Sequence, residues 1–191
     1  MSQTIAEIYR KILPIVGQKY KCPITKNKGR PGLFLEELLG IPHTSNCLDC
    51  DDGEVKTFPV KILKNGKVVP KESMAITMLS KDELKSNDFE SSKFYTKMSR
   101  VLMVPCLRDG DNIEFMTPTI IDKDCDECTE IYETIKTDYE LIRNKFIANG
   151  TFKSRDGTLL QNRTKGAGHG STSRAFYLRP DFMKRYVPLS L

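Results

Sequence analysis

The sequence predicts a mixed α/β domain, in which helices flank a mixed β-sheet. Three observations lead to this prediction: an amphipathic helix-like segment at the start of the chain, several strand-like runs in its middle, and a long helix-like segment before a final strand and helix. At 191 residues the chain suits one domain that can divide into two lobes. It contains no internal repeat, linker or low-complexity tract.

Glycine, proline and apolar spacing define the N-terminal elements. Residues 3–16 place five apolar side chains at helical spacing and predict an amphipathic helix. Residues 26–32 contain two glycines and a proline, which is typical of a loop. Residues 33–40 read as a short helix that Gly40 closes.

A turn signal and two apolar runs predict the sheet. The tetrapeptide Lys64-Asn65-Gly66-Lys67 is typical of a β-hairpin and places strands around residues 55–63 and 67–79. Residues 99–106 predict a buried strand, and residues 113–116 predict its partner across a glycine-containing turn.

The C-terminal third combines helix, loop and strand signals. Residues 122–147 form the clearest helix, with Asn149-Gly150 as its stop signal. Residues 165–171 contain three glycines and predict a flexible loop ahead of the last strand and helix.

Composition indicates a globular protein that does not enter a membrane. Hydrophobic residues make up 39% of the chain and charged residues 29%. No apolar run approaches the ~18 residues that a membrane span needs. The first residues lack the layout of a signal peptide, and six cysteines without one indicate reduced thiols. We therefore expect a cytoplasmic or nuclear location.

The net charge of +5 is concentrated at one end of the chain. Residues 151–191 hold eight basic and two acidic residues, a net +6, while the other 150 residues sum to −1. An anionic polymer such as a nucleic acid would be attracted to this end. A solvated basic tail is the alternative, but the apolar residues at 175–178 and 182–187 favour a packed segment.

Residues 46–60 contain a candidate metal-dependent phosphodiesterase site. Glu54 and Lys56 lie in a strand-like run, so both side chains point to the same face. Asp49 lies just before the turn pair Asp52-Gly53, so a hairpin there would bring its carboxylate beside Glu54. Two carboxylates can hold Mg²⁺, and a neighbouring lysine can orient or deprotonate the attacking water or stabilise developing charge.

A Glu-x-Lys pattern alone has little weight, because the chain has 25 acidic and 30 basic residues. A second copy, Glu83-Leu84-Lys85, lies in a polar stretch and reads as a solvated helix start or loop. The Glu54 copy instead precedes a strand-like run at residues 57–63.

Four separated segments resemble the MutH family of DNA endonucleases, which comprises the MutH mismatch-repair nickase and related GATC-cleaving type II restriction endonucleases. They stand in the family's order and span roughly residues 28–187. The segments are Lys28–Glu36 with Leu39-Gly40, similar to "KGxxGxxLE"; Asp49–Val60, similar to an Asp ahead of "ExKTxPV"; Lys97–Pro105, similar to "KLSRVLxxP"; and Leu160–Ala167 with Arg174–Leu178, similar to the DNA-reading loop and final strand.

The resemblance implies a restriction-endonuclease-like core and Mg²⁺-dependent hydrolysis of double-stranded DNA, with Mn²⁺ able to substitute. Asp49, Glu54 and the backbone carbonyl of Val55 would be the metal ligands. Lys56 would serve the attacking water, and the products would carry 5′-phosphate and 3′-hydroxyl ends.

Two further residues would complete the active site by resemblance. Glu36 would be an outer carboxylate beside the metal, and its alternative is an exposed helix residue. Lys97 would be an additional active-site lysine, and its alternative is a surface charge at the entry to a strand.

The resemblance also implies a DNA-reading part within residues 151–191. Arg163 and Lys165 would enter the major groove, where their donors suit guanine O6 and N7. Their alternative is phosphate contact without base reading. Gly166 and Arg174 would also contact DNA, and Tyr177 would lie near the target adenine or, alternatively, in the core. The eight acidic residues within 121–140 should face away from the DNA.

Two departures from the family's pattern affect the assignment. The family places its Asp seven residues before the Glu, whereas Asp49 is five residues before Glu54, so Asp51 or Asp52 is an alternative ligand. We prefer Asp49 because Asp52-Gly53 is better used as the turn. The reading loop is short and rich in glycine, which leaves the recognised sequence open.

The cysteines and histidines support other sites less well. Cys47-x-x-Cys50 and Cys125-x-x-Cys128 could together bind structural zinc, with free thiols as the alternative. His43 and His169 are too isolated to indicate a histidine-based metal site.

Three functions remain open from the sequence. The first is a type II restriction-like endonuclease that cuts both strands at GATC. The second is a strand-nicking mismatch-repair endonuclease that acts with a MutL-type activator. The third is a DNA-binding module with a vestigial site, against which the complete Asp, Glu and Lys set argues. The sequence does not fix the oligomeric state.

Overall fold

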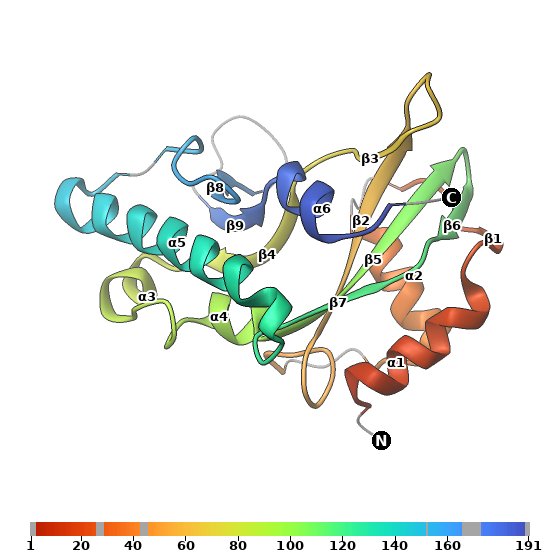
Figure 1. Cartoon of the computed structure of the whole chain (residues 1–191), viewed down its shortest axis with the longest axis horizontal. Helices are drawn as coiled ribbons and strands as arrows, with labels where there is room; N and C mark the ends of the chain where they lie inside the picture. The colour runs from red at the N-terminus through yellow and green to blue at the C-terminus, as the bar shows by residue number, and fades with distance from the viewer. Residues whose placement is uncertain (1–2, 26–28, 43–45, 152, 166–172, 190–191) are drawn as a thin grey trace.

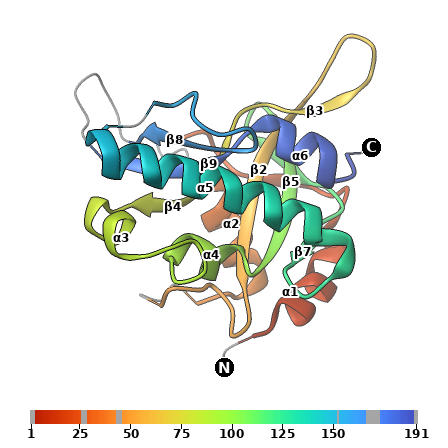
Figure 2. The same cartoon turned by 60° about the vertical axis from the view of Figure 1, so that its left-hand side comes forward.

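The computed structural model describes residues 3–25, 29–42, 46–151, 153–165 and 173–189, which form two β-sheets with flanking helices (Figure 1 and Figure 2). The strands are β1 (Lys19–Lys21), β2 (Glu54–Ile62), β3 (Val68–Pro70), β4 (Met74–Leu79), β5 (Arg100–Asp109), β6 (Asn112–Phe115), β7 (Thr119–Asp122), β8 (Leu160–Thr164) and β9 (Arg174–Leu178). The helices are α1 (Ile5–Ile12), α2 (Arg30–Leu39), α3 (Lys81–Ser86), α4 (Lys93–Met98), α5 (Thr129–Asn149) and α6 (Pro180–Tyr186), with 3₁₀ turns at Leu13–Ile15 and Asp126–Cys128. The expected α/β class is confirmed.

The larger sheet is mixed and has the order β1-β6-β5-β2-β3, with β7 also paired to β5. Its central strands β2 and β5 run parallel, with Glu54 opposite Val101. Because the strands are parallel, their N-terminal ends lie at the same edge of the sheet. The residues that precede β5 are therefore brought beside the start of β2.

The predicted hairpin is present, but its second strand is shorter than expected. β2 and β3 pair antiparallel around Gly66, which has a φ of 81°. Residues 67–79 form two strands rather than one: β3 ends at Pro70, and its pairing with β2 closes with the bond from the Lys71 N–H to the Pro59 carbonyl at 2.8 Å. The following strand, β4, pairs with β9 in the other sheet.

The smaller sheet is antiparallel in the order β4-β9-β8, and α5 packs along it. Figure 2 shows α5 crossing in front of this sheet. Ile135 and Tyr139 of α5, Phe176 of β9, and Phe58 and Met103 of the larger sheet belong to one buried cluster. The two sheets therefore share a continuous hydrophobic core.

A second core lies on the opposite face of the larger sheet, against α1 and α2. Successive residues of β5 alternate between the two cores: Val101 and Met103 face the first, and Leu102 and Val104 face the second. This alternation explains the continuous apolar run in the sequence, since a strand covered on both faces carries no polar side.

The long helix ends as predicted but starts later. Gly150 caps α5 with a φ of 64°, in agreement with the stop signal. Residues 122–128 were expected to be helical, but Asp122 completes β7 and residues 126–128 form a 3₁₀ turn. Residues 166–171 of the predicted flexible loop lie outside the described residues.

None of the helices in the described ranges is long and apolar enough to cross a membrane.

Candidate active site

Glu54 and Lys56 lie at the start of β2, on the same face of the strand. Glu54 is only 1% exposed, and its Oε1 atom accepts a short hydrogen bond from Lys56 Nζ. The Lys56 side chain keeps 22% of its surface accessible. The cluster therefore combines a buried carboxylate with an ammonium group that solvent or a ligand can reach.

Lys97 reaches the same carboxylate from a distant part of the chain. It lies in the last turn of α4, and its Nζ atom is 2.6 Å from Glu54 Oε1. The parallel pairing of β2 with β5 explains this approach, because α4 ends two residues before β5 begins. The two lysines place positive charge on both sides of one buried carboxylate.

Asp49 completes the group from the loop before β2. Its Oδ2 atom accepts a hydrogen bond from the backbone N–H of Val55 at 3.0 Å and lies 3.6 Å from Lys56 Nζ. Lys56 Nζ also donates to the Val55 carbonyl at 3.3 Å. The ammonium group thus contacts oxygens of Asp49, Glu54 and Val55, the three residues expected to hold a metal.

These residues fit a hard divalent cation. Carboxylate and carbonyl oxygens are the ligands that Mg²⁺ prefers, and the Lys56 ammonium marks a position where a positive charge contacts all three residues. Within the described part of the chain, the buried Oε2 atom of Glu54 has no hydrogen-bond partner. A buried carboxylate oxygen without a partner is costly, and a bound cation would satisfy it.

Asp52 is engaged in holding the loop. Its Oδ1 atom accepts the backbone N–H of Ile5 at the start of α1 (2.7 Å), and its Oδ2 atom accepts from Arg100 (2.8 Å). Arg100 also donates to Asp122 of β7 at 2.6 Å. This double ion pair raises the pKa of Arg100, chiefly through the hydrogen bonds to Asp122 and Asp52.

Gly53 ends the loop before β2, and the hairpin expected at Asp52-Gly53 is wrong because no described strand that precedes β2 pairs with it. The Gly53 carbonyl accepts the N–H of Cys50 at 2.9 Å. A Cβ atom at Gly53 would lie 2.5 Å from the Arg100 carbonyl oxygen and 2.6 Å from Cγ1 of Ile5. Only glycine therefore fits between α1 and β5. The role of Arg100 was missed from sequence, although this residue stands inside the Lys97–Pro105 segment.

Glu36 lies on α2 and is half-buried. The helix packs against β2, the strand that carries Glu54 and Lys56. Glu36 is thus on an element adjacent to the cluster, and its part in the chemistry stays a prediction.

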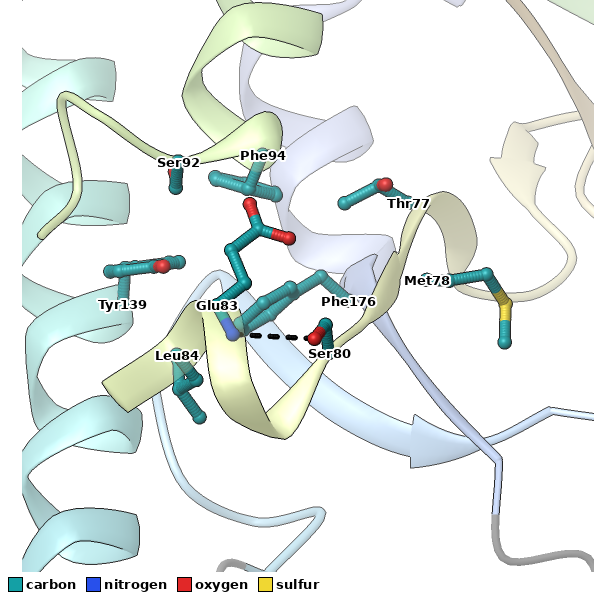
Figure 3. A pocket seen from close by; sticks show the side chains of 9 residues that line it. All are labelled: Thr77, Met78, Ser80, Glu83, Leu84, Ser92, Phe94, Tyr139 and Phe176. Atoms are coloured by element: carbon teal, nitrogen blue, oxygen red, sulfur yellow. Dashed lines mark hydrogen bonds between the residues drawn. The ribbon is translucent and has the colours of Figure 1, made fainter. Parts of the chain in front are cut away.

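The second Glu-x-Lys copy has a structural role, as expected of a helix start. Ser80 caps α3 by accepting the N–H of Glu83 at 3.3 Å. The Glu83 carboxylate accepts the N–H of Lys93 at 2.6 Å. Figure 3 shows Glu83 beside a small pocket whose lining includes the rings of Phe94, Tyr139 and Phe176.

The cysteines are free thiols. Among the described residues no group of three or more His, Cys, Asp or Glu side chains is arranged to hold a metal ion, so the two Cys-x-x-Cys pairs do not form a four-thiolate site. Burial, together with the carboxylates of Asp49 and Asp52, raises the pKa of the Cys50 thiol to about 12. This thiol stays protonated at neutral pH and is a poor nucleophile.

The predicted DNA-reading residues lie on the smaller sheet. Arg163 is exposed on β8, and its guanidinium carbon is 5.8 Å from the centre of the Tyr177 ring on β9. The two residues share a face, because Gln161 is opposite Tyr177 and Arg163 is two residues further along β8. Tyr177 is half-buried, so it is not a core tyrosine.

The remaining predicted contacts occupy the end of the same strands. Arg174 starts β9 and donates to the buried Oδ1 atom of Asn162 at 2.8 Å. Lys165 follows β8, and its N–H donates to the Ser173 carbonyl at 2.9 Å. Gly166 lies outside the described residues. Leu160–Thr164, expected as part of the reading loop, is a strand because it pairs with β9.

Comparison with solved structures identifies the fold. The chain matches the restriction endonuclease MvaI, solved as a complex with its cognate DNA substrate, at a TM-score of 0.50 and 10% identity over 97% of each chain. No curated protein sequence matches. The chain therefore has a restriction-endonuclease fold, with a carboxylate–lysine cluster at the start of its central strand.

A sequence model narrows the class to one family. The model for the DNA mismatch repair enzyme MutH matches residues 45–144, which is more than half of the chain. The chain belongs to the MutH family and is a DNA endonuclease. The matched region contains Asp49, Glu54, Lys56 and Lys97.

Proposed function

We propose that this chain is a Mg²⁺-dependent endonuclease that recognises and cuts both strands of duplex DNA at GATC, in the manner of a type II restriction enzyme. The observation that carries the proposal is the convergence of Asp49, Glu54 and Val55 oxygens on Lys56 Nζ, with Lys97 on the same carboxylate. The fold match to a restriction endonuclease over nearly the whole chain supports the proposal that the enzyme cuts both strands.

The proposed chemistry follows from the cluster. A Mg²⁺ ion held by Asp49, Glu54 and the Val55 carbonyl would supply a Lewis acid to the scissile phosphate. Lys56 orients the attacking water or takes its proton, and Lys97 holds the Glu54 carboxylate in place through Oε1. Water oxygen bonds to phosphorus as the bond to the 3′ oxygen breaks. This leaves 5′-phosphate and 3′-hydroxyl ends.

The proposed division of labour assigns chemistry to the larger sheet and base reading to residues 151–191. Arg163 and Lys165 would donate to guanine in the major groove, with Gly166 and Arg174 on the DNA backbone and Tyr177 beside the adenine. The MvaI structure is a complex with a DNA substrate, which supports duplex DNA as the partner. One MutH-like domain, residues 1–191, would hold both parts.

A strand-nicking repair endonuclease is the second candidate, and the family model favours it because its description names a mismatch repair enzyme. Such an enzyme would need a MutL-type activator for its full rate and would respond to hemimethylated DNA.

One experiment separates these candidates. Purified protein is incubated with unmethylated and fully methylated GATC-containing plasmid, with Mg²⁺ or with a chelator. We expect linear products cut at GATC from unmethylated plasmid with Mg²⁺ only. Nicked circles would identify the repair-type nickase, and cleavage at other sequences would refute GATC. No Mg²⁺-dependent cleavage of any duplex, even with an added MutL-type protein, would refute the proposed activity.

A further inference from the structure

Asp138 is a buried carboxylate on α5 that the proposed chemistry does not use. It is 3% exposed. Its Oδ1 atom accepts the N–H of Thr158 at 2.7 Å, and its Oδ2 atom accepts the N–H groups of Leu159 and Leu160 at 2.7 and 2.8 Å. Leu160 is the first residue of β8. One side chain therefore fixes three consecutive amides at the point where this strand begins.

The segment before β8 has a second attachment to the same helix. Lys145 lies seven residues after Asp138, two helical turns along the same face of α5. Its Nζ atom is 2.5 Å from Oδ1 of Asp156, whose Oδ2 accepts the N–H of Lys153 at 2.6 Å. Residues 153–160 are thus attached to α5 at two places.

Gly157 brings the chain against Asp138. It has a φ of +85°, and a Cβ atom there would lie 2.2 Å from the Leu160 carbonyl oxygen and 3.1 Å from Asp138 Cγ. No other residue fits this approach without moving the strand or the helix.

β8 depends on this attachment because it is an edge strand. In the order β4-β9-β8 it has one strand neighbour, and no other strand in the described part of the chain pairs with its second edge. Arg163 is three residues beyond Leu160, about 10 Å along the strand. The amides bound by Asp138 therefore determine where the Arg163 side chain emerges.

We propose that Asp138 is a positioning residue for sequence recognition. Its carboxylate fixes the position of the first residues of β8. It thereby fixes where Arg163 lies beside Tyr177 and how far the Arg163 side chain reaches toward bound DNA. Discrimination between DNA sequences then depends on a helix residue that does not touch DNA. This inference rests on the proposed function, in which Arg163 reads bases.

The test compares Asp138→Asn with Glu140→Gln. Asparagine keeps the size of the side chain but places an NH₂ group against backbone donors. Glu140 is on the same helix and accepts a backbone N–H from Phe89 at 2.9 Å, which makes it a matched control outside the β8 attachment. Binding to duplexes with and without one changed base pair in the recognised site is measured in Ca²⁺, together with hydrogen exchange of the 158–160 amides.

We expect Asp138→Asn to lower the affinity ratio between the two duplexes about 10-fold and to speed exchange of the three amides. Glu140→Gln should leave the ratio within about twofold. Equal ratios in Asp138→Asn and the wild type, with faster amide exchange, would overturn the proposal. A wild-type protein that prefers no sequence would overturn it as well.

Two additional readouts keep the result interpretable. If Asp138→Asn does not fold, Lys145→Ala loosens the second attachment at a partly exposed residue and should lower the ratio about threefold; no change would count against the proposal. Sequence-selective binding by a wild type that cleaves nothing would refute the proposed hydrolysis while leaving the Asp138 inference standing.

Discussion

The proposed catalytic cluster (Asp49, Glu54, Lys56 and Lys97) and the proposed DNA-reading face (Arg163 and Tyr177) differ in how their charged side chains are enclosed. Glu54 is buried between two lysines, on the central strand of the larger sheet. Arg163 is exposed on an edge strand of the smaller sheet, where the Tyr177 ring lies beside its guanidinium. The first arrangement holds the carboxylate and ammonium groups in fixed positions. The second leaves the guanidinium of Arg163 accessible to a DNA partner. Variants in the two regions should therefore separate turnover from site choice.

Both regions depend on a carboxylate that binds backbone N–H groups. Asp52 accepts the first amide of α1 and ties the loop before Glu54 to Arg100. Asp138 accepts three amides at the start of β8. Each carboxylate lies outside the site that it supports. A carboxylate that accepts backbone N–H groups therefore positions the loop before Glu54 in one region and the start of β8 in the other.

The largest effect on turnover is expected from substitution of Lys56. Lys56→Ala removes the group that serves the attacking water, and we expect turnover to fall about 10³-fold. DNA affinity should stay within a few fold, because the change leaves the smaller sheet intact. Single-turnover cleavage and equilibrium binding measure the two quantities. Equal loss of both would point to misfolding, and normal cleavage would exclude Lys56 from the chemistry.

A smaller effect, on the choice of DNA sequence, is expected from substitution of Arg163. Arg163→Ala should lower discrimination against a changed base pair by about 10- to 100-fold, the range for one bidentate base contact. Stability should change by less than about 1 kcal/mol, since the residue is exposed and its ring contact is weak. Cleavage of matched and altered duplexes tests this, and unchanged site choice would indicate a phosphate contact instead.

The free energy of unfolding at acid pH should depend on Asp156, which helps attach the segment before β8 to α5. Burial raises the pKa of this carboxyl, but the hydrogen bonds from Lys145 and the Lys153 amide outweigh it and lower the pKa overall. A lowered native pKa gives stability that is complete above the unfolded pKa of about 3.9 and is lost as the pH falls through the native pKa.

Asp156→Asn should therefore flatten the fall in unfolding free energy as the pH drops below about 4. Denaturant unfolding at several pH values measures the slope. Asp181→Asn is the control, because Asp181 forms an exposed pair with Lys184 and should change stability by less than about 0.5 kcal/mol. An identical slope in Asp156→Asn and the wild type would contradict this account.

Metal removal is expected to have only a small effect on stability. In the catalytic cluster two lysines balance two carboxylates, so folding does not require a cation there. A chelator should abolish cleavage yet shift the unfolding free energy by less than about 1 kcal/mol. Thermal unfolding with and without chelator measures this. A large fall in the midpoint would contradict this account and would indicate a structural metal.

Strand geometry made part of the site predictable from sequence. Glu54 and Lys56 share a face because alternate residues of any strand do so. The hairpin expected at Asp52-Gly53 is absent, since the segment before β2 is a loop held by Asp52. The approach of Lys97 to Glu54 spans 43 residues and depends on parallel pairing of β2 and β5, which local patterns do not specify. Only the family resemblance placed Lys97 in the site.

Asp138 was not predictable because it lies within an acidic stretch of the long helix. Composition indicates that such residues face solvent, and most acidic residues do. What distinguishes Asp138 is the set of three amides that reaches it from residues 158–160. These amides belong to a segment outside the helix, so the spacing of residues along the helix does not indicate them.

The contacts of Lys56 have a consequence for how the protein is switched on. If a divalent cation binds at the proposed ligands, it competes with an ammonium group that is part of the same chain and is always present. Cation binding then displaces Lys56 Nζ from the oxygens of Asp49, Glu54 and Val55. Activity would rise with the concentration of free divalent ion, while the amount of folded protein stayed the same.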